Sequence, residues 1–253
     1  MNWNYQLHYA RFHSDSPEHL RSMIQIIRSW IEPHLPADRS ARILDVGCGQ
    51  GYALATLHEI GFVHGHGIDS SPEQVAWAKA RGRSAELVTS TPDFLSARPG
   101  TFDTILLMDV LEHVPRASQR SLLTAISGSL KPGGRLILTT PNALARIAAY
   151  TRYLDYTHET MFSPESLDYL LRHSGFAGAH HHAIEAIRRP RYLFFLPSRR
   201  AMRWWLLCLF RAWRRLELIA ELGLDRAGRL PVTPALLTVA EKAGPEASAR
   251  PCP

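Results

Sequence analysis

Short apolar runs and amphipathic stretches alternate along the chain between residues 41 and 186. The apolar runs are rich in β-branched side chains and are typical of buried strands, whereas the stretches between them show helical spacing. We expect strands at 42–46, 63–68, 85–89, 103–108, 134–139 and 177–184, and helices at 51–60, 72–81, 118–129 and 163–173. This alternation predicts an α/β fold with a largely parallel sheet.

An apolar stripe at helical spacing precedes the first predicted strand. Ser16-Pro17-Glu18 has the composition of a helix start, and the stripe that follows consists of Leu20, Met23, Ile24, Ile27 and Trp30. We expect residues 1–40 to form a helical cap on the sheet. The aromatic N-terminus leaves two interpretations open, packing on the body or closure over a bound cofactor, for Tyr5, Tyr9 and His13.

The first predicted strand ends in three glycines at alternate positions, Gly47, Gly49 and Gly51, and a helical pattern follows at once. Glycine suits a turn that needs positive φ and a backbone that a ligand approaches closely. The second strand ends in Asp69, where a carboxylate can accept hydrogen bonds from two ribose hydroxyls. The pattern predicts a nucleotide-type cofactor and leaves NAD, FAD and S-adenosylmethionine open.

Two later segments separate these cofactors. Residues 102–114 read Phe-Asp-Thr-Ile-Leu-Leu-Met-Asp-Val-Leu-Glu-His-Val, and residues 130–138 read Leu-Lys-Pro-Gly-Gly-Arg-Leu-Ile-Leu. Together with the glycine loop they resemble the class I S-adenosylmethionine-dependent methyltransferases over residues 40–184. Residues 108–115 and Thr157-His158 further resemble the ubiquinone-biosynthesis O-methyltransferases and related bacterial enzymes of surface-glycan pathways. The resemblance implies a doubly wound, Rossmann-like sheet of seven strands, the last at 234–241.

The resemblance also implies a set of cofactor-binding residues. These are Asp45, Gly47, Cys48, Gly49, Gly51 and Tyr52 around the glycine loop, Asp69 and Ser70 after the second strand, Asp93 and Phe94 after the third, and Met108 and Val110 at the fourth. One position departs from the family pattern, because Thr91 stands where many relatives have an acid for the adenine amine. We expect Asp93, or backbone groups near Phe94, to serve adenine instead.

Methyl transfer to a hydroxyl requires an acceptor in line with the methyl group and removal of the acceptor's proton by a base or a metal. The candidate groups are Asp109, Glu112, His113 and His158. Similar ubiquinone-pathway enzymes and small-RNA 2′-O-methyltransferases use an acid-x-x-Glu-His set for a divalent metal, and the RNA enzymes add a distant histidine. Three interpretations stay open: all four bind a metal such as Mg²⁺, the last three act as an acid–base group without metal, or Glu112 and His113 only shape the cleft.

The positive charge of the chain is concentrated in one segment. The formal net charge is +6, and arginines recur without any acid between Glu185 and Glu217. One helical face of this segment is apolar and consists of Leu206, Leu209, Phe210, Trp213 and Leu216. Such a basic amphipathic segment with tryptophans is typical of an anionic membrane surface, which we expect residues 188–216 to contact. Packing on the domain, an oligomer interface and nucleic-acid binding are the alternatives.

The rest of the composition indicates one cytoplasmic domain, peripheral on the inner face of a membrane. The start lacks the features of a signal peptide, and no apolar run approaches the roughly 18 residues of a membrane span. We expect a cap (1–40), a cofactor-binding core (41–186), a basic insertion (187–233), a last strand (234–241) and a tail (242–253). The expected reaction is O-methylation of a small-molecule or lipid-linked acceptor, a quinone-precursor phenol or a glycan hydroxyl. RNA 2′-O-methylation and a non-catalytic cofactor-binding partner are the alternatives.

Overall fold

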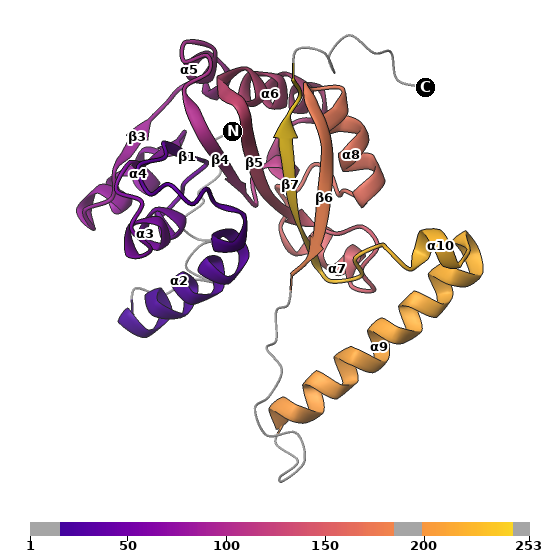
Figure 1. Ribbon diagram of the computed structural model, residues 1–253. Coiled ribbons are helices and arrows are strands. Elements are labelled where there is room, and N and C mark those ends of the chain that lie inside the picture. Colours follow the sequence, from indigo (N-terminus) through magenta and orange to yellow (C-terminus); the bar gives the residue numbers. More distant parts are fainter. Residues whose placement is uncertain (1–15, 185–198, 245–253) are drawn as a thin grey trace.

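The computed structural model describes residues 16–184 and 199–244. A seven-stranded sheet lies at its centre, in the order β3-β2-β1-β4-β5-β7-β6 (Figure 1). The strands are β1 (Ile43–Val46), β2 (Gly65–Asp69), β3 (Ala85–Leu87), β4 (Phe102–Met108), β5 (Leu130–Pro141), β6 (Phe176–Ala183) and β7 (Ala235–Lys242). β1 to β5 are parallel, and β7 runs antiparallel to both β5 and β6. The expected doubly wound sheet of seven strands is confirmed.

Neighbouring residues of a strand point to opposite faces of the sheet, so a large core packs on each face. In β1, Leu44 and Val46 belong to the first core. Ile43, the residue before Leu44, belongs to the second core on the other face. The first core is closed by α5 (Thr91–Ser96), α6 (Arg116–Ser129) and α8 (Pro164–Arg172), and the second by α2 (Pro17–Ile31) and α3 (Tyr52–Glu59). The near-continuous apolar strands of the sequence reflect this burial on both faces.

Serine–proline pairs begin several of the helices. In α2, α4 (Pro72–Ala80), α5 and α8, a serine side chain accepts a hydrogen bond from a backbone N–H of the first turn, and proline occupies the first helical position, or the second in α5. At α8 the cap is reciprocal, because the Ser166 hydroxyl also accepts from the backbone N–H of Ser163. Proline fits there because its missing N–H would have no partner in the first turn. The starts predicted at Ser16, Ser71 and Ser163 are confirmed.

Some element boundaries differ from the expected ones. β5 begins at Leu130, four residues before the predicted start at 134, and its pairing with β4 shifts register between Phe102 and Thr104. Gly133 has φ +73°, so the chain bulges there and then rejoins the strand. Three short helices were not predicted from the sequence: α5, α7 (Ala148–Leu154) and α10 (Leu224–Ala227).

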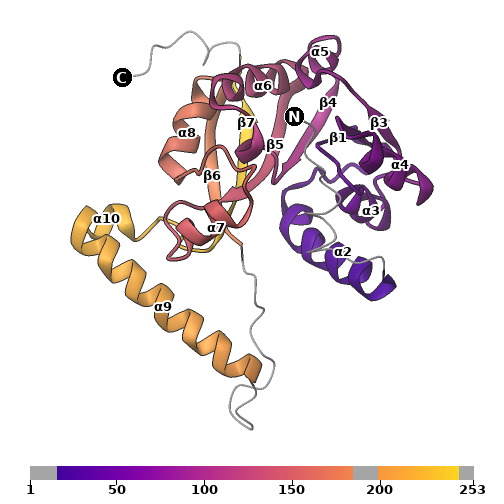
Figure 2. The ribbon, with the colours of Figure 1, turned by 180° about the vertical axis from the view of Figure 1, so that it is seen from behind.

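The order of the strands reverses between β1 and β4, and ligands of such sheets bind outside the carboxyl ends of the strands at that point. The glycine loop follows β1, Asp69 ends β2 and Asp109 follows β4, so these segments meet at one edge. The long helix α9 (Arg199–Leu222) lies apart from the sheet, beyond the carboxyl end of β6. It is at the lower right in Figure 1 and at the lower left in the reversed view of Figure 2.

Some expectations concern residues outside the described ranges. They are the roles of Tyr5, Tyr9 and His13, the arginines Arg188, Arg189 and Arg191, and the tail from residue 245 onward. Across residues 16–184 and 199–244, no helix combines the length and the apolar composition that crossing a bilayer requires.

Candidate active site

The turn between β1 and α3 forms a glycine cradle. Gly47, Gly49 and Gly51 have φ values of +72°, +49° and +76°, which L side chains rarely adopt. The backbone N–H groups of Gly47 and Cys48 both donate to the carbonyl of Ile68, at 2.8 and 3.0 Å. A Cβ on Gly47 would lie 2.5 Å from Cγ2 of Val110. The cradle therefore needs glycine for its conformation and for its contact with the segment after β4.

Asp69 fixes this cradle from the end of β2. Its Oδ2 accepts a hydrogen bond from the N–H of Gly49, and its Oδ1 accepts one from the N–H of Ser71, both at 2.8 Å. A carboxylate has about four lone-pair positions, so two remain for ribose hydroxyls. Ser70 is exposed beside it. The residues present therefore fit a nucleoside such as that of S-adenosylmethionine.

Three other predicted cofactor residues are buried beneath the loop. Asp45 is 2% exposed, and burial, together with the negative charge of Asp69, raises the pKa of its carboxyl to about 7. Cys48 packs so closely on β2 that a Cβ on Gly67 would lie 2.7 Å from its side chain. Tyr52 is buried in the core shared with α2. The assignment of all three to cofactor binding stays a prediction.

The segment expected to bind adenine is helical. Asp93 lies exposed in the first turn of α5, where its N–H donates to the Ser90 hydroxyl at 3.4 Å. Phe94 packs against the first core, and the guanidinium of Arg98 lies 3.7 Å from the centroid of its ring. Thr91 is the first residue of this helix. The adenine role of Asp93 and Phe94 stays a prediction.

Asp109 turns the chain at the end of β4. It has φ +53°, the one positive φ of a non-glycine residue in the described ranges. Its N–H donates to the Thr139 hydroxyl at 3.0 Å, and that hydroxyl donates to Asp109 Oδ1 at 2.9 Å. The turn lays Val110 on Gly47 and leads into the 3₁₀ turn η2 (Leu111–His113). Met108 ends the strand, half-buried beside the second core.

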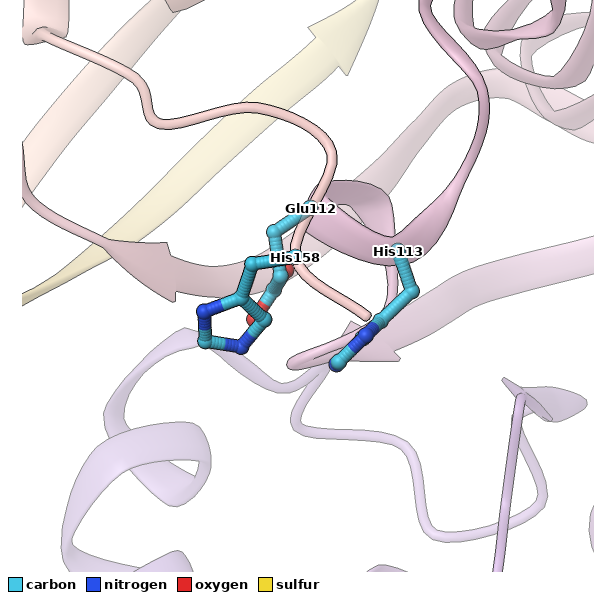
Figure 3. A group of neighbouring side chains, drawn as sticks. All are labelled: Glu112, His113 and His158. Carbon is cyan, nitrogen blue, oxygen red and sulfur yellow. The ribbon is translucent and has the colours of Figure 1, made fainter. Parts of the chain in front are cut away.

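Glu112, His113 and His158 converge beyond this turn. One potential ligand atom from each lies within 4.8 Å of the others, and the two imidazole centroids are 4.8 Å apart. Figure 3 shows Glu112 and His113 coming from η2 and His158 from a separate loop. The two segments are joined because the carbonyl of Glu112 accepts from the N–H groups of Glu159 and Thr160, at 2.7 and 3.2 Å. Asp109, the fourth predicted metal ligand, is not a member of this group.

Hydrogen bonds to neighbouring residues set the tautomer of both imidazoles. His158 Nδ1 lies 3.1 Å from the carbonyl of Thr151, which can only accept, so Nδ1 carries the proton and Nε2 a lone pair. His113 Nδ1 lies 2.9 Å from the Thr157 hydroxyl, which donates to Asp155 Oδ1 at 2.7 Å. That hydroxyl must accept from His113, so His113 also carries its proton on Nδ1. Such partners orient imidazoles in metal and acid–base sites.

Burial perturbs the ionisation of the group. Glu112 is 1% exposed, and its Oε2 has no hydrogen-bond partner. Burial raises the pKa of Glu112 well above its usual value, and the charge of Asp109 adds to the rise. Burial lowers the pKa of His158, which is therefore neutral at pH 7. An orphaned buried carboxylate beside two oriented imidazoles is a feature of functional sites.

Sequence reasoning identified the converging group but not the residues that orient it. Thr139, Thr151, Asp155 and Thr157 make the hydrogen bonds that position Asp109, His158 and His113. Asp155 and Thr157 precede His158 closely in the sequence, and this polar cluster was the only available signal.

A family model described as a methyltransferase domain matches residues 14–181. The chain belongs to this family. It is a class I, S-adenosylmethionine-dependent methyltransferase, as its motifs and its seven-stranded sheet predicted.

Curated relatives of this methyltransferase include ubiquinone biosynthesis O-methyltransferases. The one from Xanthomonas euvesicatoria is 37% identical over 107 residues, which cover 40% of this chain and 44% of the relative. The one from Xylella fastidiosa strain 9a5c is 31% identical over 172 residues, 62% of this chain and 68% of the relative. Since the match spans less than half of the first relative, the substrate of these enzymes does not transfer to this chain by similarity alone.

Solved structures share the fold of this methyltransferase. A SAM-dependent methyltransferase from Archaeoglobus fulgidus has a TM-score of 0.65 over 95% of this chain and 100% of its own, at 18% identity. A possible histamine N-methyltransferase from Thermotoga maritima has a TM-score of 0.61 over 94% and 97%, at 17% identity. At such identity the likeness establishes the fold alone.

Proposed function

We propose that this methyltransferase methylates a hydroxyl oxygen of a small-molecule acceptor, a phenol or a sugar hydroxyl. The observation that supports it best is the convergence of Glu112, His113 and His158 beside the glycine cradle. Bound S-adenosylmethionine supplies a methyl group on a positively charged sulfur, which needs no further activation. The protein therefore has to position the acceptor and remove its proton, and a hydroxyl requires both.

His158 is suited to remove that proton. Because its Nδ1 donates to Thr151, its lone pair is on Nε2, and its lowered pKa keeps that lone pair available at neutral pH. General bases of this kind contribute roughly 10²–10⁴-fold to a rate. The names of the relatives, O-methyltransferases, agree with an acceptor that must lose a proton.

The same three side chains also fit a divalent cation, which we propose as the alternative use of this group, with Nε2 of His158 then a ligand and not a base. Glu112 would supply an oxygen whose lone pairs have no partner, and the two imidazoles would supply nitrogens. When bound, such a cation lowers the pKa of an acceptor hydroxyl. Two nitrogen ligands suit Zn²⁺ or Mn²⁺ better than Mg²⁺, which prefers oxygen. Asp109 lies adjacent but is held by Thr139, so its role as a ligand stays a prediction.

Methyl transfer from tritium-labelled S-adenosylmethionine tests the proposal. The acceptors are a set of catechols, a set of sugars and an RNA oligonucleotide, and the readout is label in each extracted product. We expect label in a phenol or a sugar, and a turnover about 100-fold lower in His158→Ala with unchanged affinity for S-adenosylhomocysteine. His180→Ala, an exposed histidine on β6, is the matched control. Label in RNA alone, or normal turnover of His158→Ala, would contradict the proposal.

A further inference from the structure

Helix α9 exposes a continuous apolar stripe. Seven large apolar side chains on it are between 44% and 62% exposed: Met202, Trp205, Leu206, Leu209, Phe210, Trp213 and Leu216. Their spacing of three and four residues places them on one face of the helix. Single exposed apolar side chains are common on protein surfaces, but a contiguous stripe of this kind marks an interaction site.

The other face of α9 packs on the segment that follows the helix. Leu218 is buried and packs with Ala227 and Val232. The guanidinium of Arg215 donates to the carbonyls of Ala227, Gly228 and Leu230 at 3.0, 2.6 and 3.1 Å. These contacts fix the rotation of the helix about its axis. The apolar stripe lies on the helix face opposite these contacts, and the Arg146 guanidinium lies 5.5 Å from the ring centroid of Phe210 at the edge of the stripe.

Charge along α9 has one sign over most of its length. Every ionisable side chain from Arg199 to Leu216 other than Cys208 is an arginine, and the first acid is Glu217. Glu217 is already engaged, because Arg146, Arg214 and the indole N–H of Trp213 contact its carboxylate at 3.5, 3.1 and 2.6 Å. Arg199 and Arg203 are exposed near the edge of the stripe. The surface thus combines apolar side chains with a positive margin.

We propose that α9 lies on an anionic phospholipid surface, with the apolar stripe in the headgroup region and Arg199 and Arg203 against lipid phosphates. Tryptophans 205 and 213 belong at such an interface, where the ring is apolar and the N–H is polar. A second copy docked on the same face would bring like-charged arginine margins together. Nucleic acid would use the arginines and rings but leave Leu206, Leu209 and Leu216 without a partner.

The position of α9 links the proposed lipid contact to the candidate active site. Arg214 Nε donates to the carbonyl of Leu144 at 3.1 Å, so the helix is tied to the segment that follows β5. His158 lies in the same connection between β5 and α8. A docked α9 would hold that edge of the sheet close to the lipid surface, which deepens the proposed function by indicating a lipid-linked acceptor. The matched family region ends at residue 181, so α9 is a feature outside it.

Flotation of the full chain with vesicles tests the docking without any methyl transfer, so it stays readable if the proposed function fails. The vesicles are phosphatidylcholine alone and phosphatidylcholine mixed with phosphatidylglycerol. We expect binding to the mixed vesicles only, weakened by high salt. Leu209→Glu should lower the binding constant about tenfold or more, and Arg203→Gln about fivefold, the factor for about 1 kcal/mol per basic residue. Val63→Glu, at a 68% exposed residue before β2, is the matched control and should bind as wild type.

Absence of flotation would overturn the proposal, as would equal binding to neutral and anionic vesicles or unchanged binding of Leu209→Glu. A wild-type dimer in sedimentation that Leu209→Glu converts to a monomer, without any flotation, would assign the stripe to a second copy of the chain. RNA binding without flotation would assign it to nucleic acid.

Discussion

Asp69 joins the glycine cradle, the end of β2 and the start of α4 through one carboxylate. Asp69→Ala removes the acceptor that we assign to the ribose hydroxyls, and each such charge-assisted hydrogen bond contributes roughly 1.5–3 kcal/mol. We therefore expect the affinity for S-adenosylhomocysteine to fall by about tenfold or more in calorimetric titration. Glu73→Ala removes an exposed carboxylate nearby and should bind normally. Equal affinity of Asp69→Ala and wild type would refute the assignment.

Asp45 couples stability to pH. Burial raises the pKa of its carboxyl to about 7 in the folded protein, whereas an unfolded chain releases this proton near pH 4. Between about pH 4 and 7 the folded state thus binds more protons than the unfolded state. The free energy of unfolding should fall as pH rises through this window, by up to about 4 kcal/mol at about 1.4 kcal/mol per pKa unit.

Asp45→Asn isolates this effect, because an amide has no proton to release. We expect the variant to lose most of the fall in stability between pH 5 and 7, measured by urea unfolding of the protein without ligand. Above pH 7 both proteins should show little further change from this group. Parallel curves for wild type and variant across the window would show that Asp45 is not the group responsible.

At the residue scale, the sequence predicted the chemistry of the site better than its geometry. The converging side chains were recognisable because residues 108–115 and Thr157-His158 resemble a motif of related methyltransferases, and the structure leaves Oε2 of the buried Glu112 without a partner. The orienting contacts were not recognisable. Thr151 acts through its backbone carbonyl, which every residue has, and Thr157 bonds His113 across 44 positions of sequence.

At the element scale, the predicted strands and long helices were correct because their apolar periodicity is strong and their starts carry caps. The short helices were missed for a physical reason. α5, α7 and α10 have six, seven and four residues, too few to show a period of 3.6. The start of β5 was misplaced because a lysine–proline–glycine run reads as a turn, although the chain bulges there within the strand.

The glycine cradle can be tested as an element by comparing two glycines of equal φ. Gly47 and Gly82 both have φ +72°, but a Cβ on Gly82 would meet nothing within 4 Å, whereas one on Gly47 would overlap Val110. Gly82→Ala should cost only the strain of the left-handed conformation, about 1–2 kcal/mol. Gly47→Ala should cost more and should also abolish cofactor binding.

Val110→Ala in the Gly47→Ala background separates the two causes. Removal of Cγ2 relieves the overlap but not the backbone strain, so the double variant should recover stability to about the level of Gly82→Ala. Thermal and urea unfolding measure the stability of the wild type, Gly82→Ala, Gly47→Ala and the double variant. If Gly47→Ala is no less stable than Gly82→Ala, the contact between the cradle and the turn after β4 is unimportant.

At the scale of the whole molecule, the sheet gathers its functional segments at one edge. The cradle after β1, the turn after β4 and the connection after β5 all lie at the carboxyl ends of the parallel strands, and α9 is tied to the last of these. A lipid surface and a methyl acceptor can therefore meet the protein on the same side. The packing of separate elements produces this arrangement, and motif order alone did not indicate where α9 would lie.

Because Glu112 and His113 come from η2 and His158 from the connection after β5, a cation bound by all three would crosslink two parts of the molecule. We expect Zn²⁺ or Mn²⁺ to raise the melting temperature, since a ligand at 100 times its Kd stabilises the folded state by about 2.7 kcal/mol. Glu112→Gln and His158→Ala should lose this shift, and a chelator should abolish turnover until metal is restored.

The pH dependence of that metal shift follows from the same ionisations. A cation must displace the proton that the raised pKa of Glu112 retains, so affinity should increase with pH, and binding should release a proton. The control is His182→Ala, because the rings of His34 and His182 lie 4.6 Å apart and form a second imidazole pair that could capture Zn²⁺. If His182→Ala loses the shift in melting temperature and His158→Ala keeps it, the metal binds at the His34–His182 pair instead.

If a chelator leaves turnover intact and no cation shifts the melting temperature, His158 acts as a base without metal. The acid limb of the rate profile should then lie below pH 6.5, because burial lowers the pKa of His158.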